Sequence, residues 1–267
     1  MIELIQITND PAFARRCDAL EGMRLFVDLE RQGKAARQAG RNTFISTHQI
    51  DDIAKTKSQL RRSRLMVRVN PLHPGTRDEV QAVLDAGADL LMLPMFTRAE
   101  ELEQFMATVD GRAPVSALLE TADALHALES WIDTPDLAEV FLGLNDLHLS
   151  LRQRFMFEPL AEGIVERVAT AVLGRGIRFG FGGIARLDEG ELPGRDVLAE
   201  HLRLGSQAVI LSRTFNRDDS RFEDEVAALR TAEARLTLRS RQQMEADAER
   251  IAATIGRIAC AVAASPG

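Results

Sequence analysis

Hydrophobic and polar positions follow two alternating patterns over the first 215 residues. Short apolar runs rich in Val, Ile, Leu and Met recur along the chain, and segments with apolar residues three or four apart separate them. Runs of the first kind predict buried strands, and segments of the second kind predict amphipathic helices. We expect eight strands, at residues 2–7, 24–28, 65–70, 90–94, 114–120, 140–143, 178–182 and 207–211.

The helical patterns lie between these strands. They cover residues 76–86, 98–109, 123–132, 160–175 and 195–204, and three of them end at Gly87, Gly176 or Gly205. A glycine is favoured there because the residue that ends a helix often adopts a left-handed conformation. Eight strands alternating with helices predict an α/β fold, a (β/α)₈ TIM barrel, with a doubly wound open sheet as the alternative.

The second connection is longer than the others. It contains a short apolar run at residues 43–47, which we interpret as an edge segment outside the barrel, followed by a helix from about Asp51.

The pattern changes after Phe215. One apolar stripe with spacings of three and four runs through Met244, Ala248, Ile251, Ile255, Ile258 and Val262. We therefore divide the chain into a barrel at 1–215, which carries catalysis, and a helical extension at 216–267. A helix this long exceeds what one barrel strand needs, so we expect it to leave its own barrel and pack on a neighbouring subunit, giving a homo-oligomer (dimer, trimer or hexamer). Two helices folded back on the same barrel are the alternative.

The composition of the chain argues against a membrane protein, a secreted protein and a nucleic-acid-binding protein. Hydrophobic residues make up 45% of the 267 residues, yet no stretch approaches 18 apolar residues and the N-terminus lacks the pattern of a signal peptide. We expect a soluble cytoplasmic protein that contacts no membrane, and the isolated Cys17 and Cys260 agree with a reducing compartment. The net charge of −7 argues against a nucleic-acid surface.

Two acids stand at corresponding points of neighbouring strands. Glu120 closes the apolar run that begins at 114, and Asp146 closes the run that begins at 140. The carboxyl ends of successive parallel strands meet at one rim of a barrel, so we expect the two carboxylates to converge. Because two carboxylates alone repel each other, the pair predicts a hard divalent cation.

An arginine and two further acids belong to the same rim. Alternation in strand 65–70 places Arg68 on the face that points into the barrel, where a guanidinium needs an anion. Asp28 and Glu30 end the second strand. They are expected to hydrogen-bond metal-bound water or Arg68, or else to serve as helix N-terminal charge or to pair with Arg31 and Arg37.

Glycines gather at the end of the seventh strand. Residues 180–186 read GFGGIAR, and Ser212 and Arg213 follow the eighth strand. Barrels often bind phosphate there, although glycines also serve tight packing.

Five short motifs resemble the HpcH/HpaI aldolase and citrate lyase β-subunit family of phosphoenolpyruvate/pyruvate-domain barrels. They are VRVNP, LP, LET, GLNDL and DLE, at residues 67–71, 93–94, 119–121, 143–147 and 28–30. The resemblance covers about residues 1–215. It implies Mg²⁺ or Mn²⁺ on Glu120 and Asp146, and Arg68 on the keto or enolate oxygen of the substrate. It also implies a substrate carboxylate on the backbone N–H groups of Asn145 and Asp146, and exchange of the eighth helix between subunits.

The sequence departs from this family at two places. The aldolases have an acid-base histidine where this chain has Arg31, and His48, in the long second connection, could reach the rim as the proton carrier instead. The segment at 31–37 is shorter than in the lyases, which puts CoA-thioester binding in doubt.

These features lead to three hypotheses. The first is a metal-dependent carbon–carbon lyase or aldolase acting on a 2-oxo acid through a pyruvate-type enolate. The second is a CoA-thioester lyase of the citryl or malyl type. The third is a barrel that has lost turnover and serves as a scaffold subunit.

Overall fold

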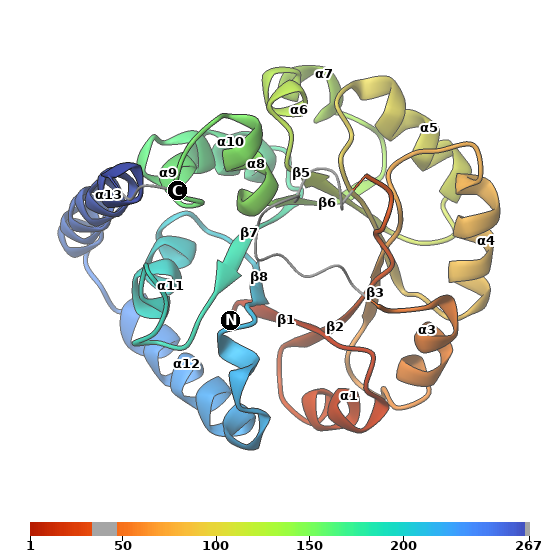
Figure 1. Ribbon diagram of the computed structural model, residues 1–267, viewed down its shortest axis with the longest axis horizontal. Coiled ribbons are helices and arrows are strands. Elements are labelled where there is room, and N and C mark those ends of the chain that lie inside the picture. Colours follow the sequence, from red (N-terminus) through yellow and green to blue (C-terminus); the bar gives the residue numbers. More distant parts are fainter. Residues whose placement is uncertain (34–46, 265–267) are drawn as a thin grey trace. The chain divides into compact units, whose positions relative to one another are not determined.

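The computed structural model describes residues 1–33 and 47–264. Eight strands pair in sequence order into a closed barrel, which confirms the TIM-barrel prediction (Figure 1). They are β1 (Glu3–Ile7), β2 (Met23–Asp28), β3 (Leu65–Arg68), β4 (Leu90–Leu93), β5 (Val115–Leu119), β6 (Leu137–Leu142), β7 (Arg178–Ile184) and β8 (Ala208–Leu211). The predicted edge segment at 43–47 lies outside the described residues except for Thr47, which is in no strand.

Helices connect the strands. They are α1 (Pro11–Asp18), α3 (Ile50–Lys57), α4 (Thr76–Asp85), α5 (Ala99–Val109), α6 (Ala122–His126), α7 (Leu128–Trp131), α8 (Leu144–Ser150), α9 (Glu158–Ala161), α10 (Ile164–Leu173), α11 (Gly194–Arg203), α12 (Phe222–Thr237) and α13 (Arg241–Ala264). Among the residues of the two described ranges, no helix combines the length and the hydropathy that crossing a membrane requires.

Two predicted helices are interrupted. The helix expected at 160–175 is split into α9 and α10 by Gly163, whose φ of +73° does not fit an α-helix. The helix expected at 123–132 is likewise divided into α6 and α7 at Ala127. The three glycines predicted to end helices all have positive φ, namely +101° at Gly87, +72° at Gly176 and +68° at Gly205.

The chain forms two compact units, which are described separately. The first unit comprises Glu3–Phe141, and the second unit comprises Met1–Ile2 together with Leu142–Gly267. The sequence instead suggested a division at residue 215, where the hydrophobic pattern changes from barrel to helical extension. That division stays a prediction.

A buried ion pair defines the barrel interior of the first unit. Arg24 on β2 donates from Nη1 and Nη2 to the two carboxylate oxygens of Glu139 on β6, at 2.7 and 2.8 Å. These strands are not neighbours in the barrel, so the side chains meet across its interior. Ser116 on β5 donates to the same carboxylate at 3.0 Å, and Arg24 also pairs with Glu3 on β1.

Strand register extends this interior face to Arg68. Asp28 on β2 lies opposite Arg68 on β3, and Asp28 shares the face of Arg24 because successive side chains alternate along a strand. Arg68 therefore points into the barrel at the carboxyl end of β3, as the alternation predicts.

The C-terminal extension consists of two helices, α12 and α13, joined by a short turn at 238–240. Both helices pack against α11 of the same chain, and α13 also packs against α9. Ile251 and Ile255 of the predicted apolar stripe are fully buried there. Within the single chain the segment thus has the folded-back arrangement given as the alternative, and packing on a neighbouring subunit stays a prediction. Exchange between subunits stays a prediction.

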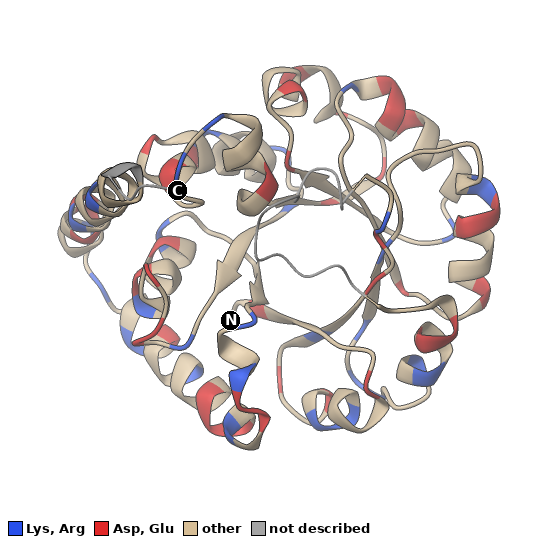
Figure 2. Cartoon of the chain, viewed as in Figure 1, with Lys and Arg blue, Asp and Glu red and all other residues tan. Residues whose placement is uncertain are grey.

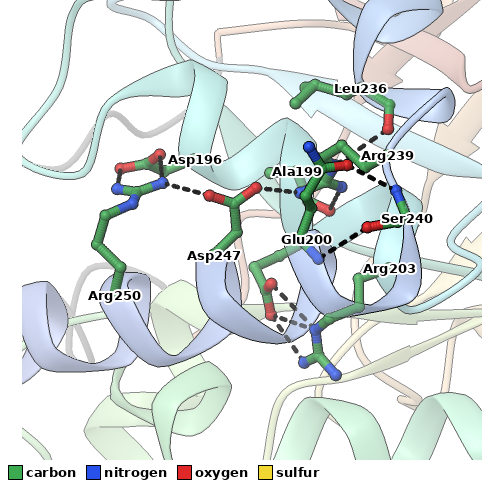
Figure 3. A network of polar contacts seen from close by, with 10 residues as sticks. Asp196, Ala199, Glu200, Arg203, Leu236, Arg239, Ser240, Asp247 and Arg250 are labelled. Atoms are coloured by element: carbon green, nitrogen blue, oxygen red, sulfur yellow. Dashed lines mark hydrogen bonds and ion pairs between the residues drawn. The ribbon is translucent and has the colours of Figure 1, made fainter.

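Polar contacts fasten this extension to α11 (Figure 3). Arg239, in the turn, donates to the carbonyl oxygen of Ala199 at 2.9 Å and to Asp247 Oδ2 at 2.7 Å. Arg250 on α13 donates to both carboxylate oxygens of Asp196 on α11, at 3.0 and 2.8 Å. Figure 2 shows that α12 and α13 carry both acidic and basic residues. The anchoring contacts are therefore specific pairs and not the attraction of two oppositely charged faces.

Candidate functional site

Arg68 is held by a bidentate ion pair at the end of β3. Its Nε donates to Asp28 Oδ1 at 2.9 Å, and its Nη2 donates to Asp28 Oδ2 at 2.8 Å. The Arg68 side chain is 15% exposed and that of Asp28 is 6% exposed. A planar guanidinium paired through two parallel bonds has a fixed orientation, so the position of Arg68 is defined before any ligand binds.

Glu30 completes the clamp. Its Oε2 lies 3.3 Å from Arg68 Nη2, its side chain is 1% exposed, and its backbone N–H donates to Asp28 Oδ1 at 3.1 Å. Asp28 and Glu30 thus both contact Arg68, which is one of the two roles proposed for them. Arg31, the alternative partner, donates from Nη2 to a backbone carbonyl, and Arg37 lies outside the described residues.

Carboxylates dominate the electrostatics at Arg68. Burial of Arg68 lowers the pKa of its guanidinium, but the charges of Asp28 and Glu30, and then that of Glu120, outweigh this effect and raise the pKa well above the usual value. Three carboxylates therefore act on one guanidinium within the first unit. Carboxylate oxygens gathered at one strand end are the ligands that a hard cation such as Mg²⁺ prefers.

Glu120 follows β5 and is almost fully buried. The backbone N–H of Met95 donates to its Oε1 at 3.1 Å. Met95 itself has a φ of +58°, which is unusual for a residue with a side chain, and such strain is found most often at functional sites. Thr121, the next residue, begins α6 by accepting a hydrogen bond from the backbone of Ala124. The Glu120 carboxylate is therefore held by the backbone of the loop after β4, while its own backbone leads directly into the capped start of α6.

The ring of His48 contacts the same strand end. Its Nδ1 accepts a hydrogen bond from the backbone N–H of Asp28 at 3.1 Å, and the residue is buried. Arg31 donates from Nη2 to the backbone carbonyl of His48 at 2.7 Å. The second connection thus brings a histidine beside Asp28, as expected. Its part in the chemistry stays a prediction.

A polar network next to this cluster orders the loops after β2 and β3. Asn70 Oδ1 accepts from the backbone N–H groups of Arg31 and Gln32, at 2.9 and 3.0 Å. Asn70 Nδ2 donates to Glu79 Oε1 at 2.8 Å, and His73 lies 3.0 Å from the other oxygen of Glu79. Sequence reasoning missed this role for Asn70 and Glu79, although Asn70 stands on the inward face of the predicted strand.

The second unit contains the remaining candidates. Asn145 and Asp146 lie in the first turn of α8, directly after Gly143. The first backbone hydrogen bond of this helix runs from Leu147 N–H to the Gly143 carbonyl at 3.0 Å, so the N–H groups of Asn145 and Asp146 belong to the turn that makes no intrahelical bonds. Asn145 is exposed and Asp146 is half-buried.

Arg186, in the glycine-rich segment after β7, has a structural role. Its Nε donates to the carbonyl oxygen of Phe215 at 3.1 Å, its Nη2 donates to that of Asp218 at 2.9 Å, and Nη1 lies 3.8 Å from Glu225. These contacts hold the segment after β8 in place. The phosphate interpretation is therefore not favoured for Arg186, since its donors already have partners.

No group of three or more His, Cys, Asp or Glu side chains placed to bind a metal ion is found in residues 1–33 and 47–264. A site built from two carboxylates and completed by substrate or water needs fewer protein ligands than that. Glu120 and Asp146 both carry hard oxygen donors; Glu120 belongs to the unit Glu3–Phe141 and Asp146 to the other unit.

A comparison with protein families matches more than half of the chain. Residues 8–161 fit the model of HpcH/HpaI aldolase/citrate lyase. The matched range contains all seven residues predicted for the site.

Individual relatives are more distant. The chain is 32% identical to a (3S)-malyl-CoA thioesterase of Cereibacter sphaeroides over 97 residues, which are 36% of this chain and 34% of that protein. The matched part therefore spans about a third of the length of this curated relative. An HpcH/HpaI aldolase/citrate lyase family protein of Burkholderia cenocepacia has a similar structure, with a TM-score of 0.63 and 16% identity over 85% of this chain and 94% of that one. An HpcH/HpaI aldolase of Desulfitobacterium hafniense gives a TM-score of 0.61 and 16% identity, over 85% and 90% of the two chains.

Proposed function

Because the chain belongs to the HpcH/HpaI aldolase/citrate lyase family, we propose that it is a divalent-metal-dependent lyase or aldolase that makes or breaks a carbon–carbon bond through a pyruvate-type enolate. One observation carries most of the proposal. Arg68 is fixed at the carboxyl end of a barrel strand by the carboxylate of Asp28, and the charges of Glu30 and Glu120 also act on it. Active sites of this fold lie at that end of the strands.

Glu120 and Asp146 are the residues that would hold Mg²⁺ or Mn²⁺. Their oxygens suit a small hard cation that keeps some of its waters. When bound, the cation would supply Lewis-acid stabilisation to the keto and carboxylate oxygens of a 2-oxo acid.

Arg68 would stabilise the charge that develops on the substrate. Asp28 occupies its Nε and Nη2, which leaves Nη1 as the donor for a substrate oxygen. Loss of one such donor typically costs about 3 kcal/mol in the barrier, or roughly a hundredfold or more in rate. The backbone N–H groups of Asn145 and Asp146 would receive the substrate carboxylate, since the first turn of a helix favours an anion.

Exchange of the methyl hydrogens of pyruvate for deuterium, followed by proton NMR in D₂O, tests enolate formation without knowledge of the aldehyde. We expect exchange that needs added Mg²⁺ or Mn²⁺ and falls at least about a hundredfold in Arg68→Lys, because lysine cannot keep the bidentate geometry. We expect Glu120→Gln to abolish it. Glu103→Gln, on the exposed side of α5, is the matched control. Exchange in Glu120→Gln at the wild-type rate would contradict the proposal.

Calorimetry separates an enzyme from a scaffold. Oxalate resembles the enolate of pyruvate in shape and charge, so the wild-type protein should bind it with Mg²⁺ present and only weakly without. A barrel that has lost turnover and ligand binding would release no heat with either component.

The second candidate is a lyase or hydrolase of CoA thioesters. The relative named (3S)-malyl-CoA thioesterase favours it, although the match covers about a third of that protein. Incubation with malyl-CoA or citryl-CoA and detection of acetyl-CoA, 2-oxo acid or released CoA would distinguish it from an aldolase. Turnover of these thioesters, without exchange of free pyruvate, would favour this candidate over the first.

A further inference from the structure

We infer that His48 is held as the neutral tautomer with its proton on Nε2, so that it serves this site as a hydrogen-bond donor and not as a base. The role of His48 as a donor to the substrate rests on the proposed function. Its tautomer is a property of the protein without substrate and does not depend on that function. It also assigns Arg31 as the residue that positions His48.

The partner of Nδ1 determines the tautomer. A backbone N–H can only donate, so the Asp28 N–H at 3.1 Å requires a lone pair on His48 Nδ1. The proton of the neutral ring is then on Nε2. Protonation of Nδ1 would direct two N–H groups at each other within a buried contact, which disfavours both the imidazolium and the other tautomer.

The direction of this hydrogen bond follows from the end of the barrel ladder. Leu29 N–H donates to the Arg68 carbonyl on β3 at 2.9 Å, and N–H groups of successive strand residues point to opposite sides. Asp28 N–H therefore points toward the β1 side, where Thr8 N–H still bonds the Phe26 carbonyl at 3.1 Å, while β1 itself ends at Ile7. The His48 ring takes the place of the next acceptor in the ladder.

The backbone at His48 is fixed from two further directions. Arg31 donates from Nη2 to the His48 carbonyl at 2.7 Å, and its own N–H donates to Asn70. On the other side, Asp52 Oδ2 accepts from Gln49 N–H at 2.9 Å and from Asn9 Nδ2 at 3.0 Å, which places the start of α3 beside the loop after β1. Arg31 thus holds the backbone of a histidine that lies 17 residues further along the same connection.

Asp28 connects this ring to the candidate catalytic arginine. Its backbone N–H orients His48, and its carboxylate orients Arg68. A neutral imidazole that donates from Nε2 can stabilise an enolate oxygen without transferring its proton, as neutral histidines do in other isomerising barrels. No bond to hydrogen is broken at His48 in this role, and the methyl proton that pyruvate loses passes to solvent water.

Histidine NMR of the resting protein tests the tautomer independently of any activity. Nitrogen-15 spectra at neutral pH, with the His48 signals identified by their loss in His48→Asn, should show a protonated Nε2 and an unprotonated Nδ1. A protonated Nδ1, or a doubly protonated ring, would overturn the inference. This result does not depend on whether the proposed reaction is correct.

Two amide variants separate a donor from a base. In His48→Gln the amide nitrogen can take the place of Nε2, whereas in His48→Asn the amide oxygen can take the place of Nδ1 and no donor remains at Nε2. Neither amide can act as a base. We expect pyruvate exchange to fall roughly a hundredfold in His48→Asn and far less in His48→Gln, since one oriented donor is worth about that factor. An equal, near-complete loss in both variants would show that His48 transfers a proton.

Arg31→Met tests the positioning role, and Arg77→Met on the exposed face of α4 is its control. We expect Arg31→Met to broaden or shift the His48 ring signals and to lower the maximal exchange rate, with little change in the half-saturating pyruvate concentration. Unchanged His48 signals in Arg31→Met would overturn the assignment of Arg31.

Discussion

Asp28 positions two neighbours through two different groups, and each residue of the cluster has a similarly defined partner. The carboxylate of Asp28 binds Arg68, its backbone N–H binds His48, and Glu30 lies 3.3 Å from the same Nη2 of Arg68 that Asp28 contacts. Side chains that are fixed in this way need little reorganisation when a substrate arrives. Single residues away from the site also determine stability, namely the buried ion pair of Arg24 with Glu139 and the buried His201.

Glu139→Gln tests the ion pair inside the barrel. Arg24 stays charged even though burial lowers the pKa of its guanidinium, because hydrogen bonds and charges of Glu139 and Glu3 raise it further. Removal of one charge leaves a buried guanidinium poorly compensated, so we expect the free energy of unfolding in urea to drop by about 3–5 kcal/mol. Glu103→Gln should leave it nearly unchanged, and an equally small effect of Glu139→Gln would contradict this account.

His201 makes stability depend on pH. Burial lowers the pKa of its imidazole to about 3, and the ring stacks on Phe181 at 3.8 Å while Nδ1 lies 2.8 Å from Ser206 Oγ. The folded pKa is below the unfolded value of about 6.5, so the neutral ring contributes stability above that pH and this contribution is lost as the pH falls. Between pH 7.5 and 5.0 the loss should be about 2 kcal/mol.

The measurement compares urea unfolding of the wild-type protein and His201→Asn at both pH values. Asparagine can keep the contact with Ser206 but does not titrate, so the variant should lose about 2 kcal/mol less over this range. Parallel pH dependence of the two proteins would show that His201 is not responsible.

Single elements were largely predictable from the sequence. All eight strands were expected within a few residues of their observed bounds, because a run of β-branched and apolar residues is a strong local signal. Alternation also predicted the inward face of Arg68. The split of α9 from α10 was missed, since a glycine inside an apolar helical pattern does not by itself reveal a positive φ.

Contacts between elements could not be derived in the same way. The sequence placed His48 in the second connection, but only the hydrogen bond from Asp28 shows which strand end it reaches. The pairing of Arg24 with Glu139 joins residues 115 positions apart, and no local pattern predicts it. The fold was therefore more predictable than the partners of the site residues.

The ion pair that joins α13 to α11 can be tested by mutation. Arg250 is 51% exposed and Asp196 only 8%, so solvent screens their ion pair in part. We expect Arg250→Gln to lower the free energy of unfolding by about 1 kcal/mol and to speed hydrogen exchange of α13 amides more than of β-strand amides. Arg241→Gln, at a 90% exposed position of the same helix, is the control. Equal exchange rates in both variants would contradict this anchoring role.

At the scale of the whole molecule, the observed barrel is the fold that the family resemblance predicted. Assembly of the chain into a homo-oligomer stays a prediction. Ile251 and Ile255 of the α13 stripe are buried within the chain, whereas Val262 of the same stripe is exposed. The molar mass of the protein in solution, measured by analytical ultracentrifugation, would establish whether it forms a dimer, trimer or hexamer.

The most direct test of the central claim is an experimental structure of the protein soaked with Mg²⁺ and oxalate. We predict one Mg²⁺ ion bound by oxygens of Glu120 and Asp146, with oxalate between the ion and Arg68 Nη1. An ion bound elsewhere, or none even with Mg²⁺ in large excess, would contradict the proposed chemistry.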